Sequence, residues 1–429
     1  MRLPPGPREP PALQTVEWIA RPTAFLRRGR ARHGEPFTIR VGWMDAPTVL
    51  VSAPEQIRRI FTTDAAVLQG GSSSTVLEPF AGPSSILVLD GPEHLRGRRA
   101  LLPPFHGEAL AGWRATVAEL AHAELDRWAP GVPLHAHARM RALTLDVILR
   151  VALGPAERPE LRAAIRRALD MTTSLPRLVA MSLSRRTWSP FLRAVRDLDA
   201  QLYRAIDGDA PVGSLLAVLR AARHDDESPP THRELRDQLV TVLAAGHETT
   251  AASLAWALER LARHPAVLER LRAREEDYLD AVVKEVLRVR PVLSIAARRV
   301  AEPFELAGWT LPPGVHVAPC IYLAHRRPQA WPDPTAFRPE RFLGAAPEPY
   351  TYLPFGGGVR RCAGAAFATL EMKEVLRAVA QRFSLRSPAR ASERMRRGSV
   401  TLMPARGGIV VPEALQPVQP CRSSAATTA

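Results

Sequence analysis

The sequence predicts a mainly α-helical protein with small β-sheets, and three observations carry this prediction. Long apolar-periodic stretches, the longest at residues 231–263, are typical of helices. Stretches that alternate apolar and other residues are short and flanked by turn residues, which is typical of small sheets. The 429 residues can bury a large core, and no linker-like stretch divides them.

Helices account for most of the chain in this prediction. They are expected, in chain order, at residues 16–30, 55–61, from 90, at 112–153, 156–209, 231–263, 276–289 and 362–383. Ser52-Ala-Pro-Glu55 is a capping-box pattern and begins the second helix. Proline is expected to kink the first helix at Pro22, and to interrupt later ones at Pro130, Pro176 and Pro190.

Strands and loops fill the remainder. Strands are expected at residues 36–41, 48–51, 304–317, 399–403 and 408–411. The first two and the last two are expected to pair as hairpins. The Gly-, Ser- and Pro-rich residues 69–85 are expected to be a loop. The folded domain is expected to span residues 1–412, and the polar residues 413–429 are expected to be a disordered tail.

Composition excludes several classes of protein. The formal net charge is +15, but only Lys284 and Lys373 are lysines and the arginines form no dense run, so nucleic-acid binding is not expected. Three cysteines without a C-x-x-C pair indicate neither a disulfide scaffold nor a zinc module, and they favour the reducing cytoplasm. The N-terminus lacks an apolar run of about 18 residues, so we expect no membrane anchor or signal peptide.

One glycine-rich stretch carries the chemistry: Phe355-Gly-Gly-Gly-Val-Arg-Arg-Cys362-Ala-Gly364. A helix follows at once, and N–H groups and the positive dipole at its N-terminus are expected to lower the pKa of the Cys362 thiol. The glycines at 356–358 permit the backbone to fold tightly under a flat ligand. A thiolate here could be a nucleophile, a redox switch or an axial ligand of iron, and the alternative is a buried structural cysteine.

Five positions of this stretch, Phe355, Gly358, Arg360, Cys362 and Gly364, resemble the haem-binding loop of the cytochrome P-450 family. The resemblance implies that Cys362 is the metal ligand and that all five residues bind the cofactor, haem b (iron protoporphyrin IX). It also implies the cytochrome P-450 fold of the soluble bacterial type. That fold is a single large helical domain with a β-rich lobe and a buried haem.

Two basic segments resemble the parts of this family that bind the haem propionates. In Asp90-Gly-Pro-Glu-His94-Leu-Arg-Gly-Arg98-Arg99, His94 and Arg98 are four residues apart and share one helix face. The alternative for this pair is a solvated basic face. The resemblance also implies Arg298 as a propionate ligand, with Arg299 as the alternative because the register is uncertain by one residue.

The longest helix carries Ala244-Ala-Gly246-His-Glu248-Thr249-Thr250 near its middle. Glycine inside a helix costs about 1 kcal/mol relative to alanine, and such a cost usually has a local reason. The segment resembles the family's oxygen-activation motif. The resemblance implies that Gly246 adjoins the cofactor, Thr249 hydrogen-bonds the bound dioxygen or its water, and Glu248 relays protons. Alternatively, Thr249 bonds the carbonyl four residues earlier and Glu248 lies on a wet face.

A helix at 276–289 holds Glu285 and Arg288, which are three residues apart and can pair. Phe337-Arg-Pro-Glu-Arg341-Phe342 resembles another segment of the same family. The resemblance implies that Arg341 joins Glu285 and Arg288 in a buried network behind the haem. That network would fix the core which positions the cysteine loop.

The resemblance implies a monooxygenase that inserts one oxygen atom from O2 into a hydrophobic small molecule, such as a fatty acid, terpenoid, steroid or polyketide. No flavin or iron–sulfur segment is visible, so a separate ferredoxin or flavodoxin with an NAD(P)H-dependent reductase is expected to supply electrons. The protein is expected to be a monomer. Two alternatives remain: a peroxygenase or isomerase on the same fold, and a non-enzymatic haem sensor or carrier.

Overall fold

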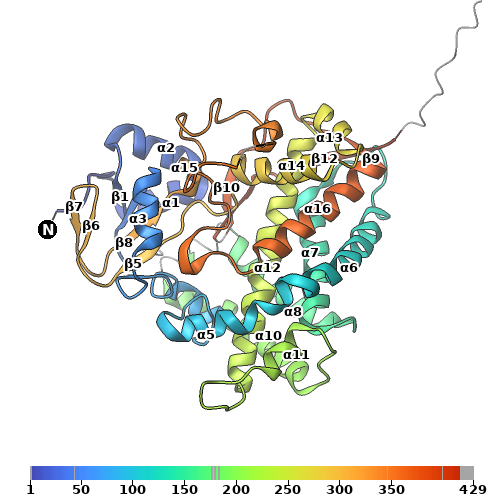
Figure 1. The fold of residues 1–429 in the computed structure, drawn as a ribbon, viewed down its shortest axis with the longest axis horizontal. Helices are drawn as coiled ribbons and strands as arrows, with labels where there is room; N and C mark the ends of the chain where they lie inside the picture. Colours follow the sequence, from blue (N-terminus) through green and yellow to red (C-terminus); the bar gives the residue numbers. More distant parts are fainter. Residues whose placement is uncertain are drawn as a thin grey trace, which may run out of the picture.

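The computed structural model describes residues 2–415 except 43, 175–176, 178–179, 182–183, 345 and 399. Most of the described chain is helical, as predicted. Figure 1 shows most of the helices gathered around one long central helix, α12 (His232–Leu261), and a strand-rich lobe at the left. The predicted mainly helical fold with small sheets is confirmed.

Helices before α12 are α1 (Pro11–Ala20), α2 (Pro22–His33), α3 (Pro54–Thr62), α4 (Glu78–Ala81), α5 (Gly91–Leu101), α6 (Gly107–Leu125), α7 (Ala136–Leu153), α8 (Pro159–Thr173), α10 (Ser189–Asp207) and α11 (Leu215–Ala221). Those after it are α13 (Pro265–Leu271), α14 (Glu276–Val289), α15 (Ile321–Ala324) and α16 (Ala365–Arg382). Short 3-10 helices are η1 (Thr75–Leu77), η2 (Pro103–Phe105), η3 (Arg185–Trp188), η4 (Pro339–Phe342) and η5 (Gly358–Arg360).

One proline prediction needs correction, one is confirmed and one falls outside the described residues. Pro22 does not kink a continuous helix; it begins α2 after α1 has ended. The predicted break at Pro190 is confirmed, because a new helix, α10, begins there with Pro190 in its first turn. Proline fits a first helical turn because its missing N–H would be unpaired there anyway. Pro176 lies outside the described residues.

The capping box predicted at Ser52 is also absent, although the helix that it predicted, α3, is present. Ala53 is the residue before α3, and no side chain caps that end. The Ser52 hydroxyl instead donates to Glu35 Oε1 at 2.5 Å. A long-range carboxylate therefore replaces the local partner that the pattern suggested.

The largest sheet of the described chain lies in the left-hand lobe of Figure 1, with strand order β1-β2-β8-β5-β3. Its strands are β1 (Phe37–Ile39), β2 (Thr48–Val51), β3 (Leu68–Gln69), β5 (Arg298–Val300) and β8 (His316–Pro319). The predicted first hairpin is confirmed, with β1 antiparallel to β2. β6 (Phe304–Leu306) and β7 (Trp309–Leu311) form a hairpin beside this sheet.

The predicted C-terminal hairpin is wrong. β11 (Thr401–Pro404) pairs with β10 (Met395–Gly398), whereas β12 (Ile409–Ala414) pairs with β9 (Phe383–Arg386) and β4 (Leu134–His135). Gly407 and Gly408, with φ of +82° and +67°, turn the chain into another sheet. β12 continues two residues past 412, and the predicted tail lies from residue 416 outside the described part.

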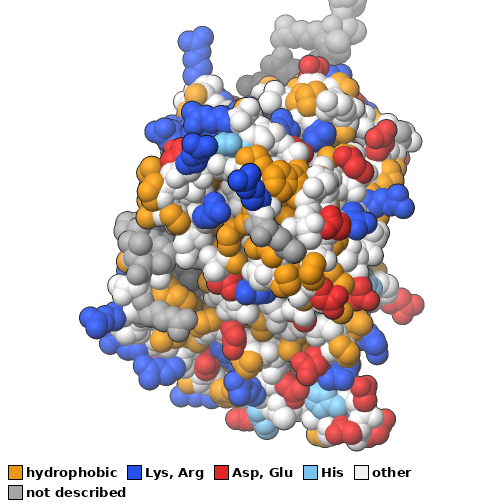
Figure 2. All heavy atoms as spheres, turned by 90° about the vertical axis from the view of Figure 1, so that its left-hand side faces the viewer, with side chains coloured by type: hydrophobic (Ala, Val, Ile, Leu, Met, Phe, Trp, Pro, Cys, Tyr) orange, Lys and Arg blue, Asp and Glu red, His pale blue; other side chains and the backbone are white. Residues whose placement is uncertain are grey.

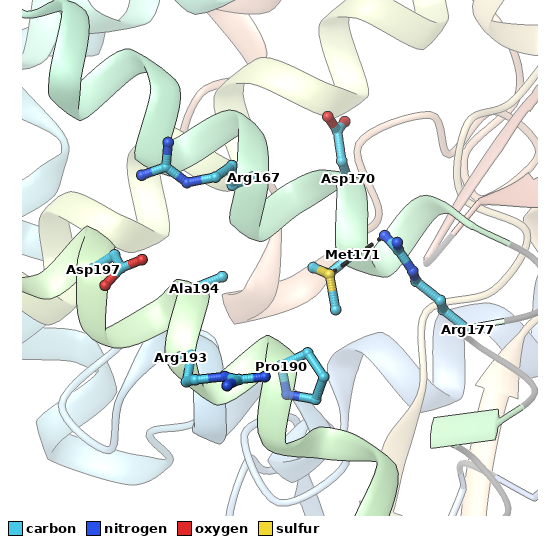
Figure 3. Close-up of a pocket in the computed structure, with 8 residues that line it drawn as sticks. All are labelled: Arg167, Asp170, Met171, Arg177, Pro190, Arg193, Ala194 and Asp197. Atoms are coloured by element: carbon cyan, nitrogen blue, oxygen red, sulfur yellow. Dashed lines mark hydrogen bonds between the residues drawn. The ribbon is translucent and has the colours of Figure 1, made fainter.

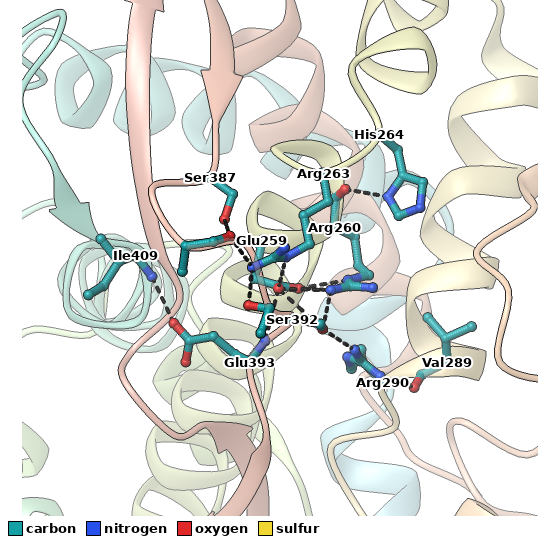
Figure 4. Close-up of polar contacts among 12 residues, drawn as sticks. Glu259, Arg260, Arg263, His264, Val289, Arg290, Ser387, Ser392, Glu393 and Ile409 are labelled. Carbon is teal, nitrogen blue, oxygen red and sulfur yellow. Dashed lines mark hydrogen bonds and ion pairs between the residues drawn. The ribbon is translucent and has the colours of Figure 1, made fainter.

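Helix α12 begins at a capping box. The Thr231 hydroxyl accepts from the Glu234 backbone N–H at 3.2 Å, and the Glu234 carboxylate accepts from the Thr231 N–H at 2.8 Å. Most of α12 is buried, and it packs on α7, α16 and β11. At its other end, Glu259 accepts hydrogen bonds from Arg260 and Arg263, which join α12 to the loop before β10 (Figure 4).

Two surface observations complete the fold. Figure 2 shows the left-hand face of the molecule, where hydrophobic side chains gather near the middle with Lys and Arg side chains around them. Among the described residues, no helix combines the length and apolar character needed to cross a membrane.

Candidate active site

The cysteine loop runs between the strand-rich lobe and α16. Gly356 and Gly358 have φ of +66° and +64°, a region that favours glycine. A Cβ on Gly357 would lie 2.5 Å from the Phe61 ring, and one on Gly358 would lie 2.6 Å from the Phe61 carbonyl oxygen. Gly357 and Gly358 thus let the loop pack on α3, whereas a Cβ on Gly364 would meet no atom within 4 Å.

The Cys362 thiol lies near the start of α16 with its surface partly exposed. Burial raises its pKa, while the Gly364 N–H and the charges of Arg98 and Arg361 act in the opposite direction. The lowered pKa predicted from the sequence is therefore wrong for the protein alone. The reason is burial of the thiol, which outweighs the opposing effects of the Gly364 N–H and the two arginines.

The three basic residues predicted to bind the propionates lie near one another, and Arg98 lies near this thiol. His94 and Arg98 come from α5, and Arg298 from β5. Burial and nearby arginines lower the pKa of His94 to about 4, and burial and the Arg360 charge lower that of Arg298 to about 10. Arg299 points away and pairs with Asp45.

His94 is neutral at this pKa, and neither of the two arginines forms an ion pair with a carboxylate among the described residues. Arg298 donates to the carbonyl oxygens of Ala297 at 2.8 Å and Gly357 at 3.3 Å. Buried positive charges without an anion are costly, and the two propionates of a haem would supply the missing negative charge. No group of His, Cys, Asp or Glu in the described chain could hold a free metal ion. A lone thiol instead suits an iron already held by a porphyrin, so these residues fit haem.

Arg360 has protein partners. Its Nη2 donates to Asp90 Oδ1 at 2.6 Å and to the Leu89 carbonyl, and its Nη1 donates to the Ile86 carbonyl at 2.7 Å. Both terminal nitrogens are thus engaged within the chain. A direct haem contact by Arg360 stays a prediction, and the structure gives the side chain another role, argued below.

The middle of α12 has one solvent-accessible spot, at Ala245 and Thr249, which we call the opening. Ala245 is exposed and Thr249 half-buried in a helix that is otherwise mostly buried. The Thr249 hydroxyl donates to the Ala245 carbonyl at 2.6 Å, which is the back-bond expected in the alternative interpretation. A Cβ on Gly246 would lie 3.0 Å from Ile148 Cδ1, so close packing on α7 by itself accounts for this glycine.

Glu248 points toward α7, and the expectation that it lies on a wet face is wrong because it is buried. It accepts from Arg141 Nε at 2.9 Å, and His137 Nε2 lies 3.3 Å from its other oxygen. Burial opposes ionisation, but the His137 hydrogen bond and the Arg141 charge lower the pKa of Glu248 to about 2. Arg141 also pairs with Asp170 of α8 at 2.8 Å.

Sequence reasoning missed His137, Arg141 and Asp170. The sequence could have shown that His137 and Arg141 share one face of a helix, because they are four residues apart. Which acid that face would meet could not be read from the chain, since Glu248 lies more than 100 residues away in sequence.

The predicted network behind the site is confirmed. Glu285 accepts from Arg288 Nε at 2.6 Å and Nη2 at 2.8 Å, and from Arg341 Nε at 3.0 Å. Glu285 and Arg288 are fully buried. The network joins α14 to η4.

A cavity of about 440 Å³ lies apart from these residues, between α8 and α10 (Figure 3). Its lining residues are Arg167, Asp170, Met171, Arg177, Pro190, Arg193, Ala194 and Asp197. None of the predicted site residues belongs to it. Its one link to the site is Asp170, through the pair with Arg141.

The fold and these residues define a haem-thiolate protein. The cytochrome P450 family model matches residues 4–411. Putative cytochrome P450 135B1 of Mycobacterium tuberculosis is 38% identical, over 95% of this chain and 90% of its own length. Putative cytochrome P450 138 of the same organism is 36% identical, over 96% of each chain. The chain therefore belongs to the cytochrome P450 family of monooxygenases, whose cofactor is a haem bound through a cysteine thiolate.

Solved structures agree. The retinoic acid-bound cyanobacterial CYP120A1 superimposes with a TM-score of 0.86, over 97% of this chain and 100% of that chain, at 26% identity. The heme domain of cytochrome P450DA shares the fold, with a TM-score of 0.84 at 22% identity.

Proposed function

We propose that this protein inserts one oxygen atom of O2 into a hydrophobic small molecule, with electrons from a separate ferredoxin or flavodoxin and its NAD(P)H-dependent reductase. The observation that carries the proposal is the opening on α12, where Thr249 is half-buried, together with the buried, ionised Glu248 that precedes it in the helix. The bound haem supplies electron transfer and oxygen–oxygen bond cleavage. The chain must supply a binding surface, a thiolate and protons.

The proton-handling residues have distinct tasks in this proposal. Thr249 contributes a hydroxyl at the opening, and this hydroxyl now donates its hydrogen bond to the Ala245 carbonyl oxygen. Glu248 is ionised at neutral pH and is held by Arg141. To relay a proton it must first take one up from solvent, which requires Arg141 or His137 to release its carboxylate, and it can then pass that proton toward Thr249 and return to the ionised form. Thr249 and Glu248 point in different directions, so a water must connect them.

The proposed substrate class rests on apolar side chains. Leu293 and Ile295, in the segment between α14 and β5, are partly exposed, while Val292 and Leu243 are buried in the core. CYP120A1 holds retinoic acid, and we take from it only the apolar character of such a ligand. On the cysteine loop, Arg361 and Val359 are exposed, which suits an acidic electron donor.

A library of fatty acids, terpenoids, steroids and polyketides provides the first test. We expect at least one compound to shift the ferric haem from low to high spin. That compound should then be oxygenated with NAD(P)H, ferredoxin, reductase and labelled O2, with the label recovered in the product. Turnover with peroxide but not with the reductase would favour the peroxygenase. The absence of both turnover and any spin shift would favour the sensor or carrier.

Thr249→Ala separates the oxygen-handling role from general damage. We expect reductase-driven product formation to fall about tenfold or more, the range of one lost proton-transfer group, with the spin shift retained. Ser253→Ala is the matched control, because Ser253 makes the same type of back-bond, to the Thr249 carbonyl at 2.9 Å, one turn later in α12. Equal losses in both variants would contradict the assigned role of Thr249.

A further inference from the structure

Asp90 lies directly before α5, but its carboxylate does not cap that helix. Oδ1 accepts from the Gly71 N–H at 2.7 Å and from Arg360 Nη2 at 2.6 Å. Oδ2 accepts from the Ser72 N–H at 2.7 Å and from the Ser72 hydroxyl at 2.8 Å. One half-buried carboxylate thus holds four donors from two other segments.

Two glycines allow the 70–73 loop to come this close to Asp90 and Arg360. A Cβ on Gly71 would lie 2.3 Å from the Val88 carbonyl oxygen, and one on Gly70 would lie 2.7 Å from Arg360 Nε. Such contacts are too short for any side chain. Gly70 and Gly71 therefore allow their loop to lie against both the segment before α5 and the Arg360 side chain.

These contacts connect three segments that carry residues predicted to bind the haem. Arg360 belongs to the cysteine loop, two residues before Cys362. α5, which follows Asp90 directly, carries His94 and Arg98. The Ser73 hydroxyl donates to the Ala297 carbonyl at 3.0 Å, next to Arg298.

The charge on Asp90 matters as well as its geometry. Arg98 and Arg298 already lie near the neutral His94 without an ion-paired carboxylate among the described residues. If Arg360 lost Asp90, its guanidinium would become a further unpaired cation beside them. It would then be held only by the carbonyl oxygens of Ile86 and Leu89.

We propose that Asp90 is a positioning residue for the haem. By holding Arg360 and the 70–73 loop, it fixes the cysteine loop relative to the residues predicted to bind the propionates. The inference rests on the family's cofactor and not on the proposed monooxygenase activity. Its test therefore needs haem but neither substrate nor reductase. Failure of the proposed reaction would leave it standing.

The test measures haem retention and iron ligation in the holoenzyme. For Asp90→Asn we expect haem transfer to apomyoglobin to be about tenfold faster, the scale of one lost charge-assisted hydrogen bond. We also expect part of the ferrous–CO complex to lose its thiolate-type spectrum, measured well below the unfolding temperature. Asp225→Asn is the matched control, because Asp225 pairs with Arg96 of the same helix at 3.1 Å on the exposed surface.

A purely structural Asp90 would lower the unfolding temperature and leave haem retention and the CO spectrum unchanged, and that result would overturn the proposal. If Asp90→Asn does not fold, Ser72→Ala decides, since it removes a single hydroxyl bond to the same carboxylate. We expect Ser72→Ala to lose haem severalfold faster. A wild-type rate in that variant would overturn the proposal too. The rate of haem loss from Arg360→Lys should fall between those of the wild type and Asp90→Asn. Lysine keeps the positive charge but loses the hydrogen bonds to the Ile86 and Leu89 carbonyl oxygens.

Discussion

At the scale of single residues, the two cysteines of the described chain differ in environment. Cys362 is exposed on one side and faces the cations Arg98 and Arg361. Cys320 is completely buried, and burial raises its pKa to about 12. Cys320 is therefore a neutral packing residue, whereas at Cys362 the charges of Arg98 and Arg361 oppose the effect of burial, which raises the pKa of its thiol.

Cys362→Ser should lower the haem content and abolish the thiolate-type ferrous–CO spectrum, because a serine hydroxyl is a far weaker base than a thiolate. Cys320→Ala is the matched control. It should cost about 1 kcal/mol of unfolding free energy, as an ordinary core substitution does, and leave the spectrum unchanged. An unchanged spectrum in Cys362→Ser would contradict the assignment of Cys362 as the iron ligand, on which the whole site depends.

At the scale of elements, one ionic chain joins three helices. Glu248 of α12 binds Arg141 of α7, and Arg141 binds Asp170 of α8. Breaking a buried pair by removing one partner leaves a buried charge uncompensated. Arg141→Met should therefore destabilise the protein by roughly 3 kcal/mol at neutral pH. Urea unfolding measured from pH 7 to pH 3 tests this.

The pH dependence of that loss has a definite sign. In the wild type the pKa of Glu248 is lowered from 4.5 to about 2, so its stabilising contribution is complete above about pH 4.5 and is lost as the pH falls toward 2. In Arg141→Met, acid should protonate Glu248 and relieve its unpaired charge. The difference between the two proteins should therefore shrink below pH 4.5. Arg96→Met, which breaks an exposed pair, should cost less than about 1 kcal/mol.

Elements with local signals were predictable, and those that depend on distant partners were not. The full extent of α14, predicted at residues 276–289, follows from neighbouring residues. The partner of β11 does not, because two glycines at 407 and 408 redirect the strand that follows it. The site divides in the same way. Motif resemblance placed Cys362, whereas the contact of Arg360 with Asp90 spans 270 residues and leaves no local pattern.

At the scale of the whole molecule, the Glu285 network is the point where distant segments meet. Besides Glu285, Arg288 binds the carbonyl oxygens of His325 at 3.0 Å and Pro334 at 2.8 Å. Arg341 brings η4 to the same carboxylate. The network thus joins α14 to the segments that lead toward the cysteine loop, so its loss should affect haem binding as well as folding.

Glu285→Gln should destabilise the protein by about 3–5 kcal/mol, because it leaves Arg288 and Arg341 buried without a counter-charge. Glu276→Gln on the same helix is the matched control, since its pairs with Lys373 and Arg377 are half-exposed and should be worth less than about 1 kcal/mol each. Urea unfolding followed by circular dichroism and by haem absorbance measures both effects. We expect the two signals to be lost together and at lower urea in Glu285→Gln. Equal stability of the two variants would show that the network is dispensable to the core.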